Sequence, residues 1–418
     1  MQKIIVKKFG PIEFAEIEIN DFVVLIGEQA SGKSTIAKLI YFFQTLKEDI
    51  IFEVSESTER NTPDAAARAV IKKLQDKFAL YFGSARYYDN EYNIKFYFTD
   101  ERFIELSRTP LSINFEPKQF FNDIVNAFLQ FKTTRESQNI NSGTKLLYLI
   151  ENLRRGLNSI FYDDKKYSFI PAGRNITTAY GDTINTILYG VITKNIDVKS
   201  KFGQIDLFLM HEFLEKVSEF KVRFNNKTFL DLISDNDVAL GQFANETTNI
   251  LKGKYSNSNG NEEIIVEGRE MPVPLSQAST GQQESIRILQ DIFLSVLDNQ
   301  PSFKIIEEPE AHLSPHGQNG VIKLMVSLLG SVVNQKILIT THSDHILNGL
   351  LVATKKFDLG ETGGISHERT RVYFFHKEDN ALKTKVIEIP ILKGGKIKNP
   401  PIGFFDQIST DRKYLMGF

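Results

Sequence analysis

The sequence predicts an α/β fold in which one central sheet is interrupted by a long insertion. Near the start, apolar and polar residues alternate through residues 4–19 as in exposed antiparallel strands, and the apolar run 22–26 indicates a buried strand. A second block of helices and short strands begins near Ser279 and ends in a β-rich tail that includes residues 371–375 and 385–389. The roughly two hundred residues between these blocks are far too many for a loop.

These observations divide the chain into three parts. Residues 1–48 and 266–418 are expected to form one head with an antiparallel β subdomain, and residues 49–265 a large, mainly helical inserted lobe with some strands. Within the insertion, the pattern predicts helices near residues 70–81 and 205–220. It also predicts two paired strands near residues 94–98 and 103–106, and a polar, turn-rich segment at residues 254–263.

Composition excludes several classes of protein. The chain contains no cysteine, which rules out disulfides, zinc-cysteine sites and a cysteine nucleophile and fits a reducing compartment. The formal net charge of -2 provides no overall basic field for nucleic acid. The first residues carry charges where a signal peptide needs an apolar core, and the longest apolar run, 321–333, contains Lys323 and is too short to span a membrane. We therefore expect a soluble, cytoplasmic protein with no membrane partner.

A phosphate-binding loop follows the buried strand directly. Residues 27–34 match the pattern G-x-x-x-x-G-K-[ST], and an amphipathic helix begins immediately afterwards. Glycines let the backbone N–H groups and the helix N-terminus approach phosphate oxygens closely. Lys33 is expected to reach the β and γ phosphates, and the Ser34 hydroxyl to bind Mg²⁺. The predicted ATP-binding residues are Gly27, Glu28, Gln29, Ala30, Ser31, Gly32, Lys33, Ser34 and Thr35.

Two acidic residues end a second apolar strand, at residues 303–306. Glu307 is predicted to hold the metal, directly or through water, and Glu308 to accept a proton from the attacking water. Taken alone, such an acidic run is more often a solvated turn, but its place after a strand in a chain with a phosphate-binding loop favours catalysis. Because aspartate usually holds the metal here, the longer Glu307 leaves open which of the two carboxylates lies nearer the ion.

A small hydroxyl cluster and a glycine precede the amphipathic helix of the second block. Ser279, Thr280 and Gly281 are typical of a helix cap, and in isolation the cap is the better interpretation. A helix N-terminus of this kind can also serve as a second anion site.

Together, these motifs resemble those of a known family. The segments GEQASGKST, ASTGQQES, IIEEPEAHLSP and ITTHSDHIL are similar to those of ABC-type AAA ATPases related to the overcoming-lysogenization-defect proteins, RecF and the chromosome-maintenance ATPases. The segments FGPIEFAEIEI and PIGFFDQ also resemble that group. The resemblance covers the two ends of the chain well and the insertion poorly, and it implies a P-loop NTPase fold of the ABC-ATPase type.

The resemblance also implies a head-to-tail homodimer that closes over two ATP molecules. His342 would be the switch histidine that contacts the γ phosphate and acts with Lys33 and Glu308, and residues 310–315 would lie along the dimer seam. Arg174 follows a segment that resembles a recurrent one in these proteins; it would point towards the nucleotide or the partner, or be a surface arginine after a turn. The residues that would bind the γ phosphate held by the opposite subunit are Ser279, Thr280, Gly281 and Gln282, a degenerate signature because many relatives have glycine at position 280.

The sequence leaves three biological roles open. The first is a nucleotide-driven sensor or switch that controls a separate effector, a nuclease or toxin, in antiphage defence; after His342 we find no acidic cluster like that of a fused Toprim nuclease. The second is a DNA repair or recombination ATPase of the RecF kind, and the third an ATP-gated structural clamp. The basic pairs 154–155 and 165–166 are compatible with DNA contact but equally with a solvated face.

Overall fold

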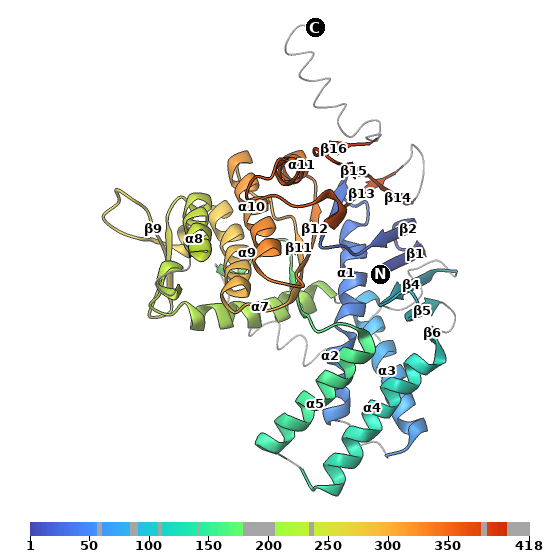
Figure 1. Ribbon diagram of the computed structural model, residues 1–418. Coiled ribbons are helices and arrows are strands. Elements are labelled where there is room, and N and C mark those ends of the chain that lie inside the picture. Colours follow the sequence, from blue (N-terminus) through green and yellow to red (C-terminus); the bar gives the residue numbers. More distant parts are fainter. Residues whose placement is uncertain are drawn as a thin grey trace.

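The computed structural model describes residues 1–56, 61–83, 91–107, 111–140, 142–178, 205–233, 238–377 and 383–398 (Figure 1). The closing segment PIGFFDQ lies outside the described residues. In the described part of the chain, no helix is both long and apolar enough to cross a bilayer.

Most described strands join one sheet of eleven strands, in the order β6-β5-β4-β1-β2-β14-β13-β3-β12-β11-β7. Its members are β1 (Lys3–Phe9), β2 (Ile12–Glu18), β3 (Phe22–Gly27), β4 (Asn93–Tyr97), β5 (Phe103–Ser107), β6 (Ser112–Glu116), β7 (Lys166–Ile170), β11 (Ser302–Glu307), β12 (Lys336–Thr341), β13 (Thr370–His376) and β14 (Thr384–Glu388). The neighbours from β13 to β7 run parallel, whereas β6, β5, β4, β1 and β2 pair antiparallel. The antiparallel strands agree with the predicted antiparallel β subdomain, and the strands from β13 to β7 form the parallel part of the sheet.

Two layers of helices pack on opposite faces of the eleven-stranded sheet, and part of the first layer extends beyond the sheet (Figure 1). One layer contains α1 (Lys33–Gln44), α2 (Leu46–Glu56), α3 (Pro63–Phe82), α4 (Lys118–Ser137) and α5 (Thr144–Phe161); the other contains α7 (Ile205–Arg223), α8 (Val238–Leu251), α9 (Thr280–Leu297), α10 (Pro315–Ser331) and α11 (Asp344–Asp358). A hydrophobic core lies on each face of the sheet, and strand β3 contributes to both. Its residues Val23 and Leu25 pack with the first layer, whereas Val24 and Ile26 pack with the second. A strand buried on both faces reads as a continuous apolar run, as this one does.

Smaller elements complete the described structure. A three-stranded sheet contains β8 (Lys254–Ser258), β9 (Asn261–Ile265) and β10 (Val273–Pro274), and a two-stranded one contains β15 (Ile391–Leu392) and β16 (Lys396–Ile397). Short 3-10 helices span Leu230–Leu232, Leu275–Gln277 and His367–Arg369. The segment 254–263, which we expected to be polar and turn-rich, is therefore largely a hairpin. Its turn uses Asn259 and Gly260, both with positive φ, which is the geometry that an Asn-Gly hairpin turn requires.

The insertion is less separate from the head than the sequence suggested. Strands β4 and β5 form where we predicted two paired strands, but with β6 they extend the head's own sheet beyond β1. At the opposite edge, β7 pairs in parallel with β11. Residues 49–265 are thus partly integrated into the head: the helices α4 and α5 extend away from the sheet (Figure 1), whereas four strands of this segment join the central sheet.

Candidate nucleotide site

The loop between β3 and α1 depends on two glycines. Gly27 has φ 151° and Gly32 has φ 97°, and both lie in the backbone region that favours glycine. A Cβ atom on Gly32 would lie 2.5 Å from the side chain of Ile12, and one on Gly27 would lie 2.5 Å from the carbonyl oxygen of Phe375. The first turn of α1 has no side-chain cap, so its N–H groups remain available for an anion.

Lys33 places its ammonium group inside this loop. Its Nζ atom donates to the carbonyl oxygens of Gly27 at 2.9 Å and Glu28 at 2.6 Å. Burial lowers the pKa of Lys33 to about 8, although nearby carboxylates, of which Glu308 has the largest effect, oppose the shift. A buried, partly desolvated cation at a helix N-terminus is suited to binding phosphate.

The parallel strands bring distant residues to the same sheet edge. Strand β12 lies between β3 and β11, so His342, directly after β12, lies near both the loop and the acidic turn that follows β11. The His342 Nδ1 atom is 3.4 Å from Nζ of Lys33, and its Nε2 atom is 3.2 Å from Oε1 of Glu308. His342 thus contacts both of the other predicted catalytic residues, although the roles of all three remain predictions.

The acidic turn itself is held in an uncommon conformation. Glu308 has φ 44°, a region that non-glycine residues seldom adopt, and its N–H donates to the carbonyl oxygen of Thr340 at 2.9 Å. Backbone strain of this kind persists where the surroundings fix it, and it is concentrated at functional sites. The Glu308 side chain is 42% exposed and can therefore reach a substrate from this turn.

Glu307 is buried and only partly satisfied. Its Oε2 atom accepts a hydrogen bond from the N–H of Ala172 at 3.3 Å, whereas its Oε1 atom is buried without a hydrogen-bond partner among the described residues. A buried carboxylate oxygen in this state is costly unless a cation or donor binds it.

Glu310 has a role that the sequence analysis missed. Its Oε1 atom accepts from the Thr341 hydroxyl at 2.6 Å and from the N–H of His342 at 2.9 Å, so it fixes the backbone that carries the histidine. The acidic run contains this residue, but nothing in the run distinguishes it from its neighbours, since its partner lies on another strand.

Arg174 occupies neither of the positions that the sequence suggested. It is fully buried behind the acidic turn and donates to the carbonyl oxygens of Glu307 at 2.8 Å and Glu308 at 3.0 Å. Its Nε atom also donates to the carbonyl oxygen of Glu284, in α9, at 2.8 Å. The expectation of an arginine that points towards the nucleotide or the partner, or is exposed on the surface, is thus corrected: Arg174 contacts the backbone of the acidic turn from the interior.

The start of α9 is a helix cap with an exposed end. Ser279 and Gln282 form a capping box, and Gln282 also donates to the carbonyl oxygen of Leu251 at 2.6 Å. The side chains of Ser279 and Thr280 are exposed. Gly281 is buried, and a Cβ atom there would lie 2.5 Å from the carbonyl oxygen of His312. The predicted signature residues therefore make contacts within their own chain: the Ser279 hydroxyl caps α9 through Gln282, and Thr280 lies exposed beside it.

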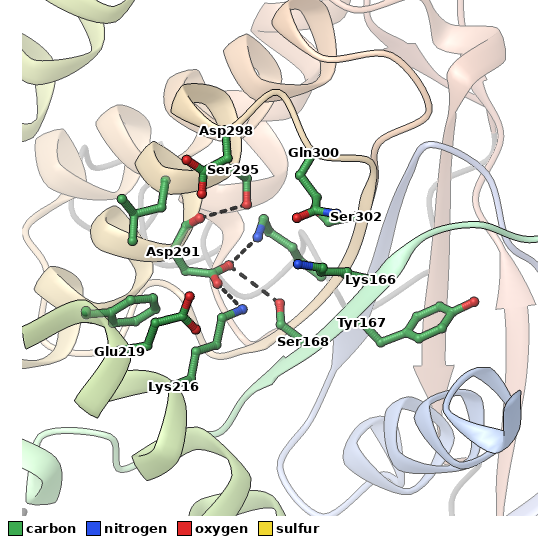
Figure 2. A pocket seen from close by; sticks show the side chains of 13 residues that line it. Lys166, Tyr167, Ser168, Lys216, Glu219, Asp291, Ser295, Asp298, Gln300 and Ser302 are labelled. Carbon is green, nitrogen blue, oxygen red and sulfur yellow. Dashed lines mark hydrogen bonds and ion pairs between the residues drawn. The ribbon is translucent and has the colours of Figure 1, made fainter. Parts of the chain in front are cut away.

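A buried ion cluster joins α9 to strands β11 and β7, farther from the sheet edge that carries the acidic turn. Asp291 of α9 forms ion pairs with Lys304 of β11 and Lys216 of α7, and Figure 2 shows Lys216 and Ser168 directed at it beside a cleft of about 100 Å³. Burial alone would raise the pKa of Asp291, but the two lysines more than offset this effect and lower it to about 2. The cluster therefore fixes α9 against β11 with charged groups.

A phosphate-binding loop on a parallel strand, with acidic residues at the end of a nearby strand, defines the class of P-loop NTPases. The chain belongs to the AAA ATPase domain family, whose model matches residues 1–347. This match confirms the predicted α/β P-loop fold. A second family model, described as a protein of unknown function (DUF3696), matches residues 365–414.

No curated protein matches the chain. Among solved structures it is similar to an Smc head bound to the C-winged helix domain of ScpA, with TM-score 0.39 and 12% identity over 93% of this chain and 97% of that one. An Smc head domain with an extended coiled coil, bound to the C-terminal domain of ScpA derived from Pyrococcus furiosus, gives TM-score 0.38, 12% identity and 100% coverage of both chains. The SMC head domain from Thermotoga maritima gives TM-score 0.36 and 12% identity over 93% and 98%.

Proposed function

We propose that this protein hydrolyses ATP to ADP and phosphate with Mg²⁺, in a head-to-tail dimer that forms when ATP binds. The observation that carries the proposal is the contact of His342 with both Lys33 and Glu308 at one sheet edge. These residues come from three separate parts of the chain, and a merely structural loop would not need to bring them together.

Phosphate binding rests on the loop between β3 and α1. The uncapped N-terminus of α1 and the ammonium group of Lys33 would hold the β and γ phosphates. Lys33 would exchange its contacts with the loop carbonyls for phosphate oxygens.

Two residues present fit a bound Mg²⁺ ion. Glu307 offers a buried carboxylate oxygen that lacks a partner among the described residues, and the Ser34 side chain is half-buried in the first turn of α1. Bound Mg²⁺ would neutralise charge on the β and γ phosphate oxygens. Because no group of three His, Asp or Glu side chains in the described ranges could hold a metal alone, phosphate oxygens and water would complete its ligands.

Glu308 would orient the attacking water and take its proton. The water oxygen forms a bond to the γ phosphorus as the bond from that phosphorus to the β,γ-bridging oxygen breaks, and ADP leaves with the electron pair. His342 keeps the Glu308 carboxylate in place at 3.2 Å, and the charge of Lys33 stabilises the developing negative charge on the phosphate oxygens.

The exposed end of α9 supports a site shared between two chains. Thr280 and the capping residue Ser279 are exposed at this helix N-terminus, where a γ phosphate held by another chain would be stabilised. ATP would thereby link the two chains, and hydrolysis would release them.

We further propose that this cycle acts as a switch for a separate effector, a nuclease or toxin, in antiphage defence. The support is the resemblance of the four motifs to the overcoming-lysogenization-defect group. DNA binding through the two basic pairs is weakened as an alternative, because Arg154 pairs with Glu48 and Lys165 pairs with Asp163. Co-purification of the product of an adjacent gene would support the switch, whereas DNA-stimulated turnover without any partner would favour a repair ATPase.

Phosphate release tests the proposed chemistry directly. The wild-type chain should release phosphate from ATP only with Mg²⁺, and Glu308→Gln should bind ATP normally but turn over at least about 100-fold more slowly. Glu361→Gln, which changes an exposed acid outside the site, is the control. Equal turnover by Glu308→Gln and the wild type would remove Glu308 from the reaction.

A further inference from the structure

The buried side chain of Arg174 lies between the acidic turn after β11 and the N-terminal part of α9. The planar guanidinium of Arg174 donates from Nη1 to the carbonyl oxygen of Glu307 at 2.8 Å and from Nη2 to that of Glu308 at 3.0 Å. Because Arg174 is fully buried, it cannot itself touch a nucleotide or a partner. Its contacts act on the backbone of the turn that carries both carboxylates.

The same guanidinium also holds α9. Its Nε atom donates to the carbonyl oxygen of Glu284 at 2.8 Å and lies 3.3 Å from the buried Glu284 carboxylate. Glu284 lies shortly after Ser279, the cap residue of this helix. Arginine suits this position because its donors are fixed in one plane, whereas a lysine ammonium is a point charge with three donors.

A second contact leaves little freedom between these two elements. The α-carbon of Gly281 packs so closely on the segment after Glu308 that a Cβ atom would lie 2.5 Å from the carbonyl oxygen of His312. Close-packed interiors transmit small displacements instead of absorbing them. A shift of the α9 N-terminus would therefore move the acidic turn as well.

We propose that Arg174 is a positioning residue that couples the exposed end of α9 to the Glu307 and Glu308 turn of the same chain. This inference rests on the proposed function, in which α9 contacts the partner's nucleotide while Glu308 acts on the nucleotide of its own chain. Arg174 then links the two nucleotide sites of the dimer, so that binding at one site sets the carboxylates of the other. Hydrolysis becomes cooperative in ATP.

Two buried arginines allow a matched test. Arg287 is also fully buried, but it lies within α9 and pairs with Glu262 of β9 through two hydrogen bonds of 2.6 and 2.7 Å; among the described residues, it makes no hydrogen bond or ion pair with the acidic turn. Arg174→Lys should bind ATP with near wild-type affinity, lose about 100-fold in kcat and lower the Hill coefficient to about 1. Arg287→Lys should lower the melting temperature but keep the wild-type kcat and Hill coefficient.

The outcomes separate this inference from the proposed function. If the wild type hydrolyses ATP but Arg174→Lys keeps kcat and cooperativity, or changes them no more than Arg287→Lys does, the coupling is wrong and the ATPase stands. A wild type that hydrolyses ATP without cooperativity would also overturn the coupling alone. If the wild type does not hydrolyse ATP, both proposals fail.

A second variant keeps the coupling testable should Arg174→Lys not fold. Glu284→Gln keeps the backbone acceptor and removes only the ion pair with Arg174. It should lower kcat and the Hill coefficient in the same direction as Arg174→Lys, and unchanged values would overturn the coupling.

Discussion

The Nδ1 atom of His342 lies 3.4 Å from Nζ of Lys33, although 309 positions separate the two residues in the sequence. The contact exists because β12 pairs in parallel with β3, so the residue after one strand lies beside the loop that follows the other. The opposite ring nitrogen is 3.2 Å from Glu308, and the histidine thus lies between the lysine proposed to bind phosphate and the proposed base.

Removal of this imidazole should affect turnover more than binding. His342→Ala leaves the loop and Lys33 intact but frees the Glu308 carboxylate, so kcat should fall about 100-fold while ATP affinity stays within about threefold of the wild type. His345→Ala is the control, since His345 is exposed in the first turn of α11. A loss confined to ATP affinity would place His342 in binding instead of positioning.

ATP binding should depend on pH through Lys33. Phosphate binds the protonated lysine, so ATP raises a pKa that burial has lowered to about 8. Below about pH 8 the lysine is already charged and the affinity is flat; above it, binding must take up a proton, and affinity should fall by up to about tenfold per pH unit.

Calorimetry with a non-hydrolysable ATP analogue measures this dependence. Two buffers of different ionisation enthalpy should reveal proton uptake at about pH 9. Lys33→Arg keeps a fixed charge, and its affinity, whatever its absolute value, should not change across this range. Flat wild-type affinity would contradict the position assigned to Lys33.

The close contact at Gly281 predicts that adding one methyl group there will destabilise the protein. In Gly281→Ala, the new Cβ atom would clash with the His312 carbonyl, which should destabilise the protein by about 1–3 kcal/mol. Gly330→Ala places a methyl group in open space near the end of α10 and should be neutral or stabilising by up to about 1 kcal/mol. Urea unfolding compares the two, and equal stabilities would show that α9 and the segment after Glu308 are not tightly packed.

The buried ion cluster of Asp291, Lys304 and Lys216 predicts a larger loss of stability than the Gly281 contact does. Asp291→Asn would leave Lys304 without its charged partner in the interior, and the free energy of unfolding should fall by about 3–5 kcal/mol. Asp298→Asn, at the end of the same helix, breaks an exposed pair with Arg223 and should cost under about 1 kcal/mol. Similar losses in the two variants would mean that the cluster contributes no more than a surface ion pair.

The elements that form the head could be predicted because their signals are local. Strand β3, the glycine-rich loop and α1 follow one another in sequence, and each has the pattern of its own structure. The predicted helix near residues 205–220 corresponds to α7 for the same reason. The hairpin of β8 and β9 was not predicted, because the polar residues of this segment are typical of a loop. The Asn259-Gly260 pair, which is typical of a hairpin turn, was the signal that could have predicted it.

Other features could not be predicted because they depend on pairings between distant segments. Strand β7 is short, and its sequence carries no signal for which strand it pairs with. Its parallel pairing with β11 is what makes it part of the head. An arginine after a turn is usually exposed, and Arg174 is buried only because Glu284 and the acidic turn surround it with acceptors. Glu310 likewise acquires its role from Thr341 of β12.

Sedimentation velocity of Glu308→Gln tests the central claim, that ATP closes two chains head to tail through α9. With ATP and Mg²⁺ this variant should sediment as a dimer, and with ADP as a monomer. Adding Thr280→Arg, at an exposed position at the start of α9, should leave ATP bound but keep the chain monomeric. A sedimentation coefficient that does not respond to ATP, or an ATP-dependent dimer that Thr280→Arg leaves intact, would contradict the account.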